Sequence, residues 1–186
     1  MSNGTKVKKR DGRIEALDLD KMHLMVDEAC TGLAGVSASQ VEMQSGIQFY
    51  DGITTDEIQE ILIKSASDLI DLEHPNYQFV AARLLLFSLR KQMYGRRSEH
   101  PKLIDHITEK CYSGVYDKDI FTKYSKEEIE KVGQWVDHDR DFLFTYAGLR
   151  QVVDKYLVQD RSSAKVYETP QFMYIMIALT IFQEYP

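Results

Sequence analysis

The chain has 186 residues and a formal net charge of -6, with 44% hydrophobic and 28% charged residues. This composition is typical of a globular protein that can bury a core, and the length suffices for one ordinary domain or two small ones. The acidic balance argues against a protein whose whole surface binds nucleic acid or an anionic membrane.

Targeting signals and cysteine motifs are also missing from the sequence. The N-terminus is polar, without the apolar segment of a secretory signal, and no apolar run reaches the roughly 18–20 residues that span a bilayer. We therefore expect a cytoplasmic protein. Cys30 and Cys111 lie far apart and outside any Cys-x-x-Cys motif, so we expect buried free thiols rather than a zinc site or a disulfide.

Positive charge is concentrated in residues 6–21. Asp11-Gly12 between two short alternating runs predicts a β-hairpin, followed by a helix that begins at Asp18. The first strand is dense in cations (Lys8, Lys9 and Arg10), and a helix start offers free N–H groups, so this stretch could bind a nucleoside triphosphate. The same cations also fit a solvated edge strand that discourages sheet pairing, or a nuclear-localisation signal.

The hairpin is followed by apolar residues at helical spacing. We expect helices at residues 19–33, 37–50, 54–69 and 75–94. Capping boxes are predicted at Ser37–Gln40 and at Thr54–Glu57. Gly95 ends the last helix, so residues 1–95 are expected to form one compact unit, a hairpin capped by four helices.

Residues 96–101 are mostly polar, which predicts a linker between the first unit and a second, mostly helical segment. Helices are expected at residues 102–113, 125–136 and 146–153, with a hairpin formed by residues 156–158 and 165–167. Pro170 opens a helix at residues 172–182 that is apolar around most of its circumference. Such a helix belongs in a large core or an interface, so we expect it to pack against further polypeptide.

Several short motifs carry a resemblance to a known family. Lys9-Arg10-Asp11-Gly12, Asp20-Lys21, Asp51-Gly52-Ile53 and the run from Pro75 to Leu84 resemble the ATP-cone. This is the regulatory nucleotide-binding module at the N-terminus of ribonucleotide reductase large subunits. Gly114-Val115-Tyr116-Asp117, His138-Asp139-Arg140-Asp141 and Glu168-Thr169-Pro170-Gln171-Phe172 are similar to the region after the cone in the class Ia large chain.

The resemblance implies a mainly α fold. Residues 1–95 would be the ATP-cone, and residues 96–186 the incomplete N-terminal part of the helical and barrel domain. Full-length members are several times longer, so the chain looks like their N-terminal portion. It would bind ATP or dATP, with Mg²⁺, as an allosteric effector, and ATP would favour activity while dATP would stop it.

The same resemblance implies partners and a limit on catalysis. The expected partners are the remainder of the large subunit, the radical-generating small subunit and further copies of the large subunit, with no nucleic acid and no membrane. The family's radical chemistry needs more cysteines than Cys30 and Cys111. We therefore expect no catalytic residue, no catalytic cofactor and no metal site in this chain, which should be inactive by itself.

By resemblance, the phosphate ligands would be Lys9, Arg10 and Lys91, although strand alternation sends Arg10 to the face opposite Lys9. Base and ribose would be lined by Glu15, Ala16, Leu17, Asp18, Leu19, Asp20 and Lys21, with Glu15 as acceptor for the adenine amino group. Thr55 and Gln59 would contact the nucleotide from one face of a helix. Asp18 also fits a plain helix N-cap, and Thr55 a capping residue.

Three residues depart from the family pattern. The family often has an amide side chain at the position of Asp18, and this departure bears on adenine recognition. Histidine often stands at the positions of Gln59 and Ser88, and these two departures bear on the strength of dATP inhibition more than on nucleotide binding. The sequence has no Gly-x-x-x-x-Gly-Lys-Ser/Thr loop, which favours binding without hydrolysis. Two alternatives stay open: a stand-alone ATP-cone regulator without reductase activity, and a helical interaction module that binds no nucleotide.

Overall fold

The computed structural model describes residues 5–95, 99–183 and 185. It divides the chain into two compact units, Met1–Ser88 with Phe144–Leu149, and Leu89–Leu143 with Arg150–Pro186. Both units are built mainly of helices, which confirms the expected mainly α fold. The domain division at residues 95 and 96 stays a prediction.

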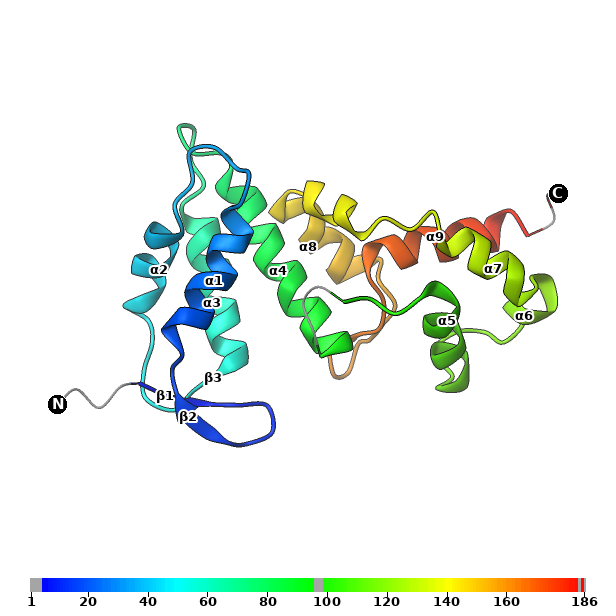
Figure 1. Cartoon of the computed structure of the whole chain (residues 1–186), viewed down its shortest axis with the longest axis horizontal. Coiled ribbons are helices and arrows are strands. Elements are labelled where there is room, and N and C mark those ends of the chain that lie inside the picture. Colours follow the sequence, from blue (N-terminus) through cyan, green and yellow to red (C-terminus); the bar gives the residue numbers. More distant parts are fainter. Residues whose placement is uncertain (1–4, 96–98, 184, 186) are drawn as a thin grey trace. The chain divides into compact units, whose positions relative to one another are not determined.

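The first unit combines a small sheet with helices (Figure 1). Its elements are β1 (Lys6–Lys8), β2 (Ile14–Ala16), α1 (Leu19–Cys30), α2 (Ala38–Gly46), β3 (Ile53–Thr54), α3 (Thr55–Asp68) and most of α4 (Tyr77–Tyr94). The expected hairpin and four helices are therefore present. Sequence reasoning missed β3, because a strand of two residues leaves no alternating pattern to detect.

The sheet has the order β2-β1-β3. Strands β1 and β2 are antiparallel, with Lys8 opposite Ile14, and β1 and β3 are parallel, with Lys8 opposite Thr54. Because β1 is paired on both sides, its cations do not lie on a free sheet edge. The interpretation as edge-strand protection is therefore wrong for Lys8, whereas Lys9 and Arg10 follow the end of β1 and for them it stays untested.

Buried apolar side chains join the sheet to the helices of this unit. Val7 from β1 and Ile53 from β3 are buried, and both face the interior. The helical part of this core includes Val26, Ala29, Val41, Leu62, Ile63, Ala66, Val80 and Leu84. The hairpin is thus fixed at one end of α1 and α3 (Figure 1). Its buried Val7 packs into the core, and its strand β1 pairs with β3, which leads directly into α3.

Helix starts in this unit follow two different rules. Thr54 and Glu57 form the expected capping box, with Glu57 N–H donating to Thr54 Oγ1 at 3.1 Å. The capping box expected at Ser37–Gln40 is wrong, because the Ser37 side chain makes no capping hydrogen bond. The buried Tyr77 hydroxyl intervenes: it accepts from Ser37 N–H at 3.0 Å and donates to Gln40 Oε1.

The second unit contains the end of α4, and α8 (Tyr146–Lys155) crosses from the first unit into it. Its other elements are α5 (Leu103–Tyr112), α6 (Ile120–Lys123), α7 (Lys126–Gly133), the 3-10 helix η1 (His138–Leu143), β4 (Gln159–Asp160), β5 (Lys165–Val166) and α9 (Pro170–Ile181). The expected hairpin exists, but its first strand lies at 159–160 rather than 156–158. Sequence reasoning missed the single-turn helix α6.

The core of the second unit includes an unusual set of rings and ions. Arg90 and Asp141 form a buried ion pair at 3.3 Å. Beside the apolar residues that α5, α7 and α9 contribute lie three histidines. His100 and His138 stack with ring centroids 3.7 Å apart, and His106 Nε2 lies 3.2 Å from the Tyr116 hydroxyl.

Helix α9 is apolar on most sides, as expected. Phe172, Met173 and Leu179 are buried, whereas Tyr174, Ile177 and Ile181 are exposed. Within the described part of the chain, every helix is too short or too polar to cross a membrane.

Candidate nucleotide-binding site

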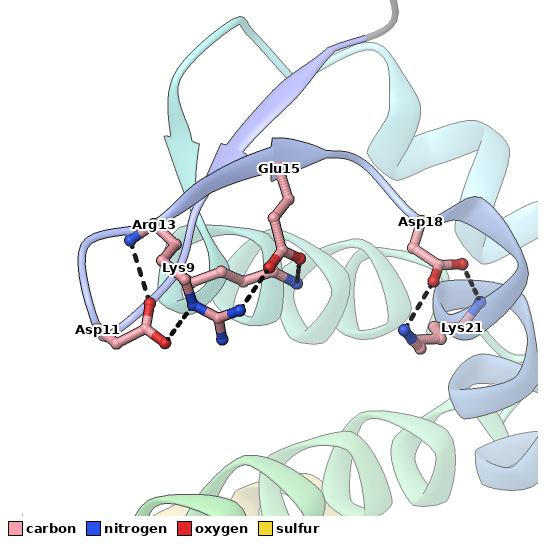
Figure 2. Close-up of polar contacts among 6 residues, drawn as sticks. All are labelled: Lys9, Asp11, Arg13, Glu15, Asp18 and Lys21. Carbon is pink, nitrogen blue, oxygen red and sulfur yellow. Dashed lines mark hydrogen bonds and ion pairs between the residues drawn. The ribbon is translucent and has the colours of Figure 1, made fainter.

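The expected cationic hairpin carries a network of ion pairs on one of its sides (Figure 2). Glu15 binds two cations, with Oε2 3.5 Å from Lys9 Nζ and Oε1 3.1 Å from Arg13. Arg13 Nε also donates to Asp11 at 2.7 Å. The hydrogen bonds from the backbone and side chain of Arg13 hold the pKa of Asp11 below its usual value. We call Lys9, Asp11, Arg13 and Glu15 the hairpin cluster.

A second charged pair stands at the start of α1. Asp18 is the N-cap of this helix, and its side chain accepts from Lys21 N–H at 3.0 Å. Lys21 Nζ lies 2.9 Å from the same carboxylate, and this side-chain contact, followed by the backbone bond, lowers the pKa of Asp18. The expected N-cap role is therefore confirmed. The N–H groups of Leu19 and Asp20, in the first turn, have no acceptor within the helix.

Gln59 presents an unmatched acceptor in the first unit. It lies on α3 with only 9% of its surface exposed, and its Nε2 donates to Met25 Sδ on α1 at 3.0 Å. Its Oε1 is buried without a hydrogen-bond partner. Thr55 lies one turn earlier, as the first residue of α3. Thr54, not Thr55, caps this helix, so the capping role considered for Thr55 is wrong.

The two remaining predicted phosphate ligands lie outside the hairpin cluster. Arg10 donates from Nε and Nη2 to Asp56 Oδ1, at 2.9 and 2.6 Å. Lys91 is exposed in the last turn of α4 and belongs to the second unit, so its contact with the nucleotide stays a prediction.

An open hollow of about 770 Å³ lies between α1 and α2. Three predicted site residues, Leu17, Leu19 and Asp20, line it, together with Thr5, Met22, His23, Ser39, Glu42, Met43, Gly46 and Phe49. Ala16 is exposed at the end of β2. Over residues 5–95, 99–183 and 185, no group of three His, Cys, Asp or Glu side chains is suited to hold a metal ion. The structure thus distributes the predicted residues over the hairpin, the start of α1 and α3, with Lys91 in α4.

Sequence reasoning missed Arg13 and Asp56. Arg13 is recoverable from the sequence, because a tight turn at Asp11-Gly12 makes the residues that flank it neighbours across the hairpin. Asp56 required knowledge of β3, since the parallel pairing of Lys8 with Thr54 is what brings Arg10 beside Asp56.

Comparison with known families assigns both segments. Residues 5–92 match the ATP cone domain, and residues 142–186 match the ribonucleotide reductase all-alpha domain. The chain therefore contains an ATP cone, followed by a segment of the ribonucleotide reductase all-alpha domain. The ATP-cone match includes the hairpin cluster, the start of α1 and all of α3. These two matches confirm the resemblance to ribonucleotide reductases.

Curated relatives of this ATP-cone chain are reductase alpha subunits. It is 47% identical to ribonucleoside-diphosphate reductase 1 subunit alpha of Escherichia coli K12 and 43% identical to the alpha subunit of Haemophilus influenzae, in each case over 100% of the chain and 24% of the relative. The alpha subunit of Enterobacteria phage T4 is 44% identical over 82% of the chain and 20% of the relative. The chain thus spans about a quarter of the length of these relatives.

Proposed function

We propose that the chain is the N-terminal, nucleotide-sensing part of a ribonucleoside-diphosphate reductase large subunit. Its cone binds ATP or dATP, with Mg²⁺, as an allosteric effector of deoxyribonucleotide synthesis, and ATP favours activity while dATP stops it. The observation that carries this proposal is the ATP-cone match over residues 5–92, because it covers the hairpin cluster and the start of α1.

Physical chemistry supports specific contacts. Lys9, Arg10 and Lys91 supply cations for the phosphates, and charge-assisted bonds to phosphate oxygens are among the stronger polar contacts in proteins. Glu15 accepts from the adenine amino group. Residues 16–21 offer main-chain groups to base and ribose, including the N–H groups of Leu19 and Asp20, which have no acceptor within α1.

Gln59 and Thr55 complete the proposed site from α3. A buried amide oxygen without a hydrogen-bond partner lowers the stability of the fold, and a ligand that donates to this oxygen would remove that cost. We propose that a hydroxyl or amino group of the nucleotide is this donor. Met25, which accepts from the other end of the Gln59 amide, fixes the orientation of the oxygen.

Reduction itself is proposed to take place outside this chain. Burial raises the pKa of Cys30 to about 11 and also raises the pKa of Cys111, so both thiols stay protonated at neutral pH. We propose that the chain works in the cytoplasm with the remainder of the large subunit, the radical-generating small subunit and further copies of the large subunit. The exposed apolar side chains of α9 offer one surface for such contacts.

Titration calorimetry with ATP and dATP tests the nucleotide site. We expect both to bind the chain, and we expect Lys9→Ala and Lys91→Ala each to weaken binding by about tenfold, the scale of one charge-assisted contact. Lys8→Ala is the matched control, because Lys8 is exposed on β1 beside the buried Val7. If neither ATP nor dATP binds, the proposal is contradicted.

A second assay tests the division of labour. The chain alone should release no deoxyribonucleotide from a ribonucleoside diphosphate, even with the small subunit and a dithiol reductant. A chain that extends through the remainder of the large subunit should turn over, and ATP should stimulate it. Turnover by the chain alone contradicts the proposal.

A further inference from the structure

The register of the hairpin pairs Lys9 with a residue to which no role has been assigned. Lys8 lies opposite Ile14, and Lys9 N–H donates to the Arg13 carbonyl at 2.8 Å. Gly12, with a φ of 85°, completes the turn between them. Residues directly opposite in an antiparallel pair project their side chains from the same face. Arg13 therefore accompanies Lys9, and Figure 2 shows both side chains on the same side of the hairpin.

These two cations share one carboxylate. Glu15 lies 3.5 Å from Lys9 Nζ and 3.1 Å from Arg13 Nη1, so both positive groups converge on a single negative charge. Arg13 also binds Asp11, and the hydrogen bond with Asp11 raises the pKa of Arg13. Its side chain is 70% exposed, so an incoming anion can reach it without burying the charge first.

We propose that Arg13 is a further phosphate-binding residue of the nucleotide site, acting beside Lys9. The inference rests on the nucleotide site proposed above. A guanidinium presents two parallel N–H donors that match the oxygens of a phosphate group. The carboxylates of Asp11 and Glu15 hold Arg13 in place without ligand, and a triphosphate, which carries more charge than either carboxylate, takes over these donors.

Arg10 differs from Arg13 in its partner. Its guanidinium donates through two nitrogens to Asp56 in the first turn of α3, and neither Asp11 nor Glu15 is among its hydrogen-bond partners. Arg13, by contrast, lies in the same ion-pair network as Lys9. The structure therefore points to Arg13 as the arginine that can reach the phosphates without leaving the neighbourhood of Lys9.

The test is calorimetry of the full chain with ATP, ADP and AMP, comparing Arg13→Gln, Arg13→Lys and the matched control Lys8→Gln. We expect Arg13→Gln to weaken ATP binding about tenfold and AMP binding less, because the lost charge acts on the distal phosphates. Arg13→Lys should recover part of the loss, since it restores charge without the planar fork. Lys8→Gln should change ATP binding less than about twofold.

The outcomes separate this inference from the proposed function. If Lys9→Gln weakens ATP binding while Arg13→Gln does not, the inference is wrong and the proposed nucleotide site stands. An equal loss for ATP and AMP in Arg13→Gln also overturns it, because that result indicates a change in hairpin structure. If the unmutated chain binds none of the three nucleotides, the inference and the proposed function both fail.

Discussion

The guanidinium of Arg10 ties the hairpin to α3 by donating from Nε and Nη2 to Asp56 Oδ1, at 2.9 and 2.6 Å. Parallel pairing explains this contact, because Lys8 lies opposite Thr54 and each partner of the ion pair follows two residues later. The pair is partly exposed, with side-chain exposures of 35% for Arg10 and 53% for Asp56. Such pairs contribute little stability, so a stronger anion can displace the carboxylate.

Asp56→Asn is therefore expected to tighten ATP binding. Arg10 loses its competing carboxylate and becomes available to the phosphates, for a gain of about threefold at low salt, the scale of a surface ion pair. Calorimetry measures the gain, and the control is Asp68→Asn, which breaks the Lys64 pair at the other end of α3. Weaker ATP binding in Asp56→Asn would show that the pair mainly anchors the hairpin.

Gln59→Met should stabilise the chain without ligand while weakening nucleotide binding. Methionine has a similar length and removes a buried amide oxygen that has no partner. An unsatisfied buried polar group costs about 1–3 kcal/mol, and part of this should return as stability in a denaturant titration. Calorimetry with ATP provides the second readout, and the exposed Gln48→Met is the control. Greater stability with unchanged ATP affinity would remove Gln59 from the site.

Tyr77→Phe should loosen the start of α2. The hydroxyl of Tyr77 accepts from Ser37 N–H and donates to Gln40, so its loss leaves the N-terminus of α2 without this cap. We expect a loss of about 1–2 kcal/mol, the scale of a buried hydrogen bond left without its partner. Hydrogen exchange should accelerate in α2 and stay unchanged in α5. Tyr112→Phe, at a residue that is 90% exposed, should change neither helix.

The second unit should lose stability in mild acid. Burial lowers the pKa of His100 and His106 to about 4 and that of His138 to about 3. These histidines therefore bind more protons in the unfolded chain than in the folded chain below about pH 6.5. Their contribution to the free energy of unfolding decreases as the pH falls toward 4. For the fully buried His106, the shift corresponds to a loss of about 3 kcal/mol by pH 4.

Charged neighbours modify this acid response. The positive charge of Arg90 disfavours protonation of His100 and His138. His106 has two charged neighbours with opposite effects: Lys110 disfavours its protonation and Glu109 favours it. Burial raises the pKa of Asp141 and Glu168, so these carboxyls take up protons more readily when folded and oppose the loss at low pH.

Thermal unfolding between about pH 7 and pH 5 measures the balance. We expect lower stability at pH 5, with a shallower dependence in His106→Gln. His23→Gln is the control, because His23 is exposed and lies in the first unit beside Glu42. A chain equally stable at both values would contradict the role of the buried histidines.

The features that the sequence predicted correctly depend on neighbours in the chain. Asp11-Gly12 located the hairpin, and the Thr54–Glu57 capping box located the start of α3, because both patterns act over three or four residues. Apolar spacing predicted α1 and α3, and the local start and stop signals at Ser37, Pro75 and Gly95 predicted α2 and α4.

The features that the sequence did not reveal depend on distant contacts. The capping box predicted at Ser37 does not form, and the hydroxyl of Tyr77, 40 residues away, accepts from Ser37 N–H instead. Strand β3 forms only because β1 pairs with it, and this pairing brings Asp56 to Arg10. The partnerless oxygen of Gln59 likewise appears only when α1 and α3 pack together. Candidate residues could be chosen from the motifs, whereas their mutual contacts required the structure.

Amide chemical-shift changes in the isotope-labelled chain, followed by NMR during a titration with ATP, test the central claim most directly. If the nucleotide binds between the hairpin and the start of α1, the largest changes should fall on residues 9–21 and on the side-chain amide of Gln59, with little change in α5 and α7. Changes concentrated in α5 to α9, or no saturable change anywhere, would contradict the account.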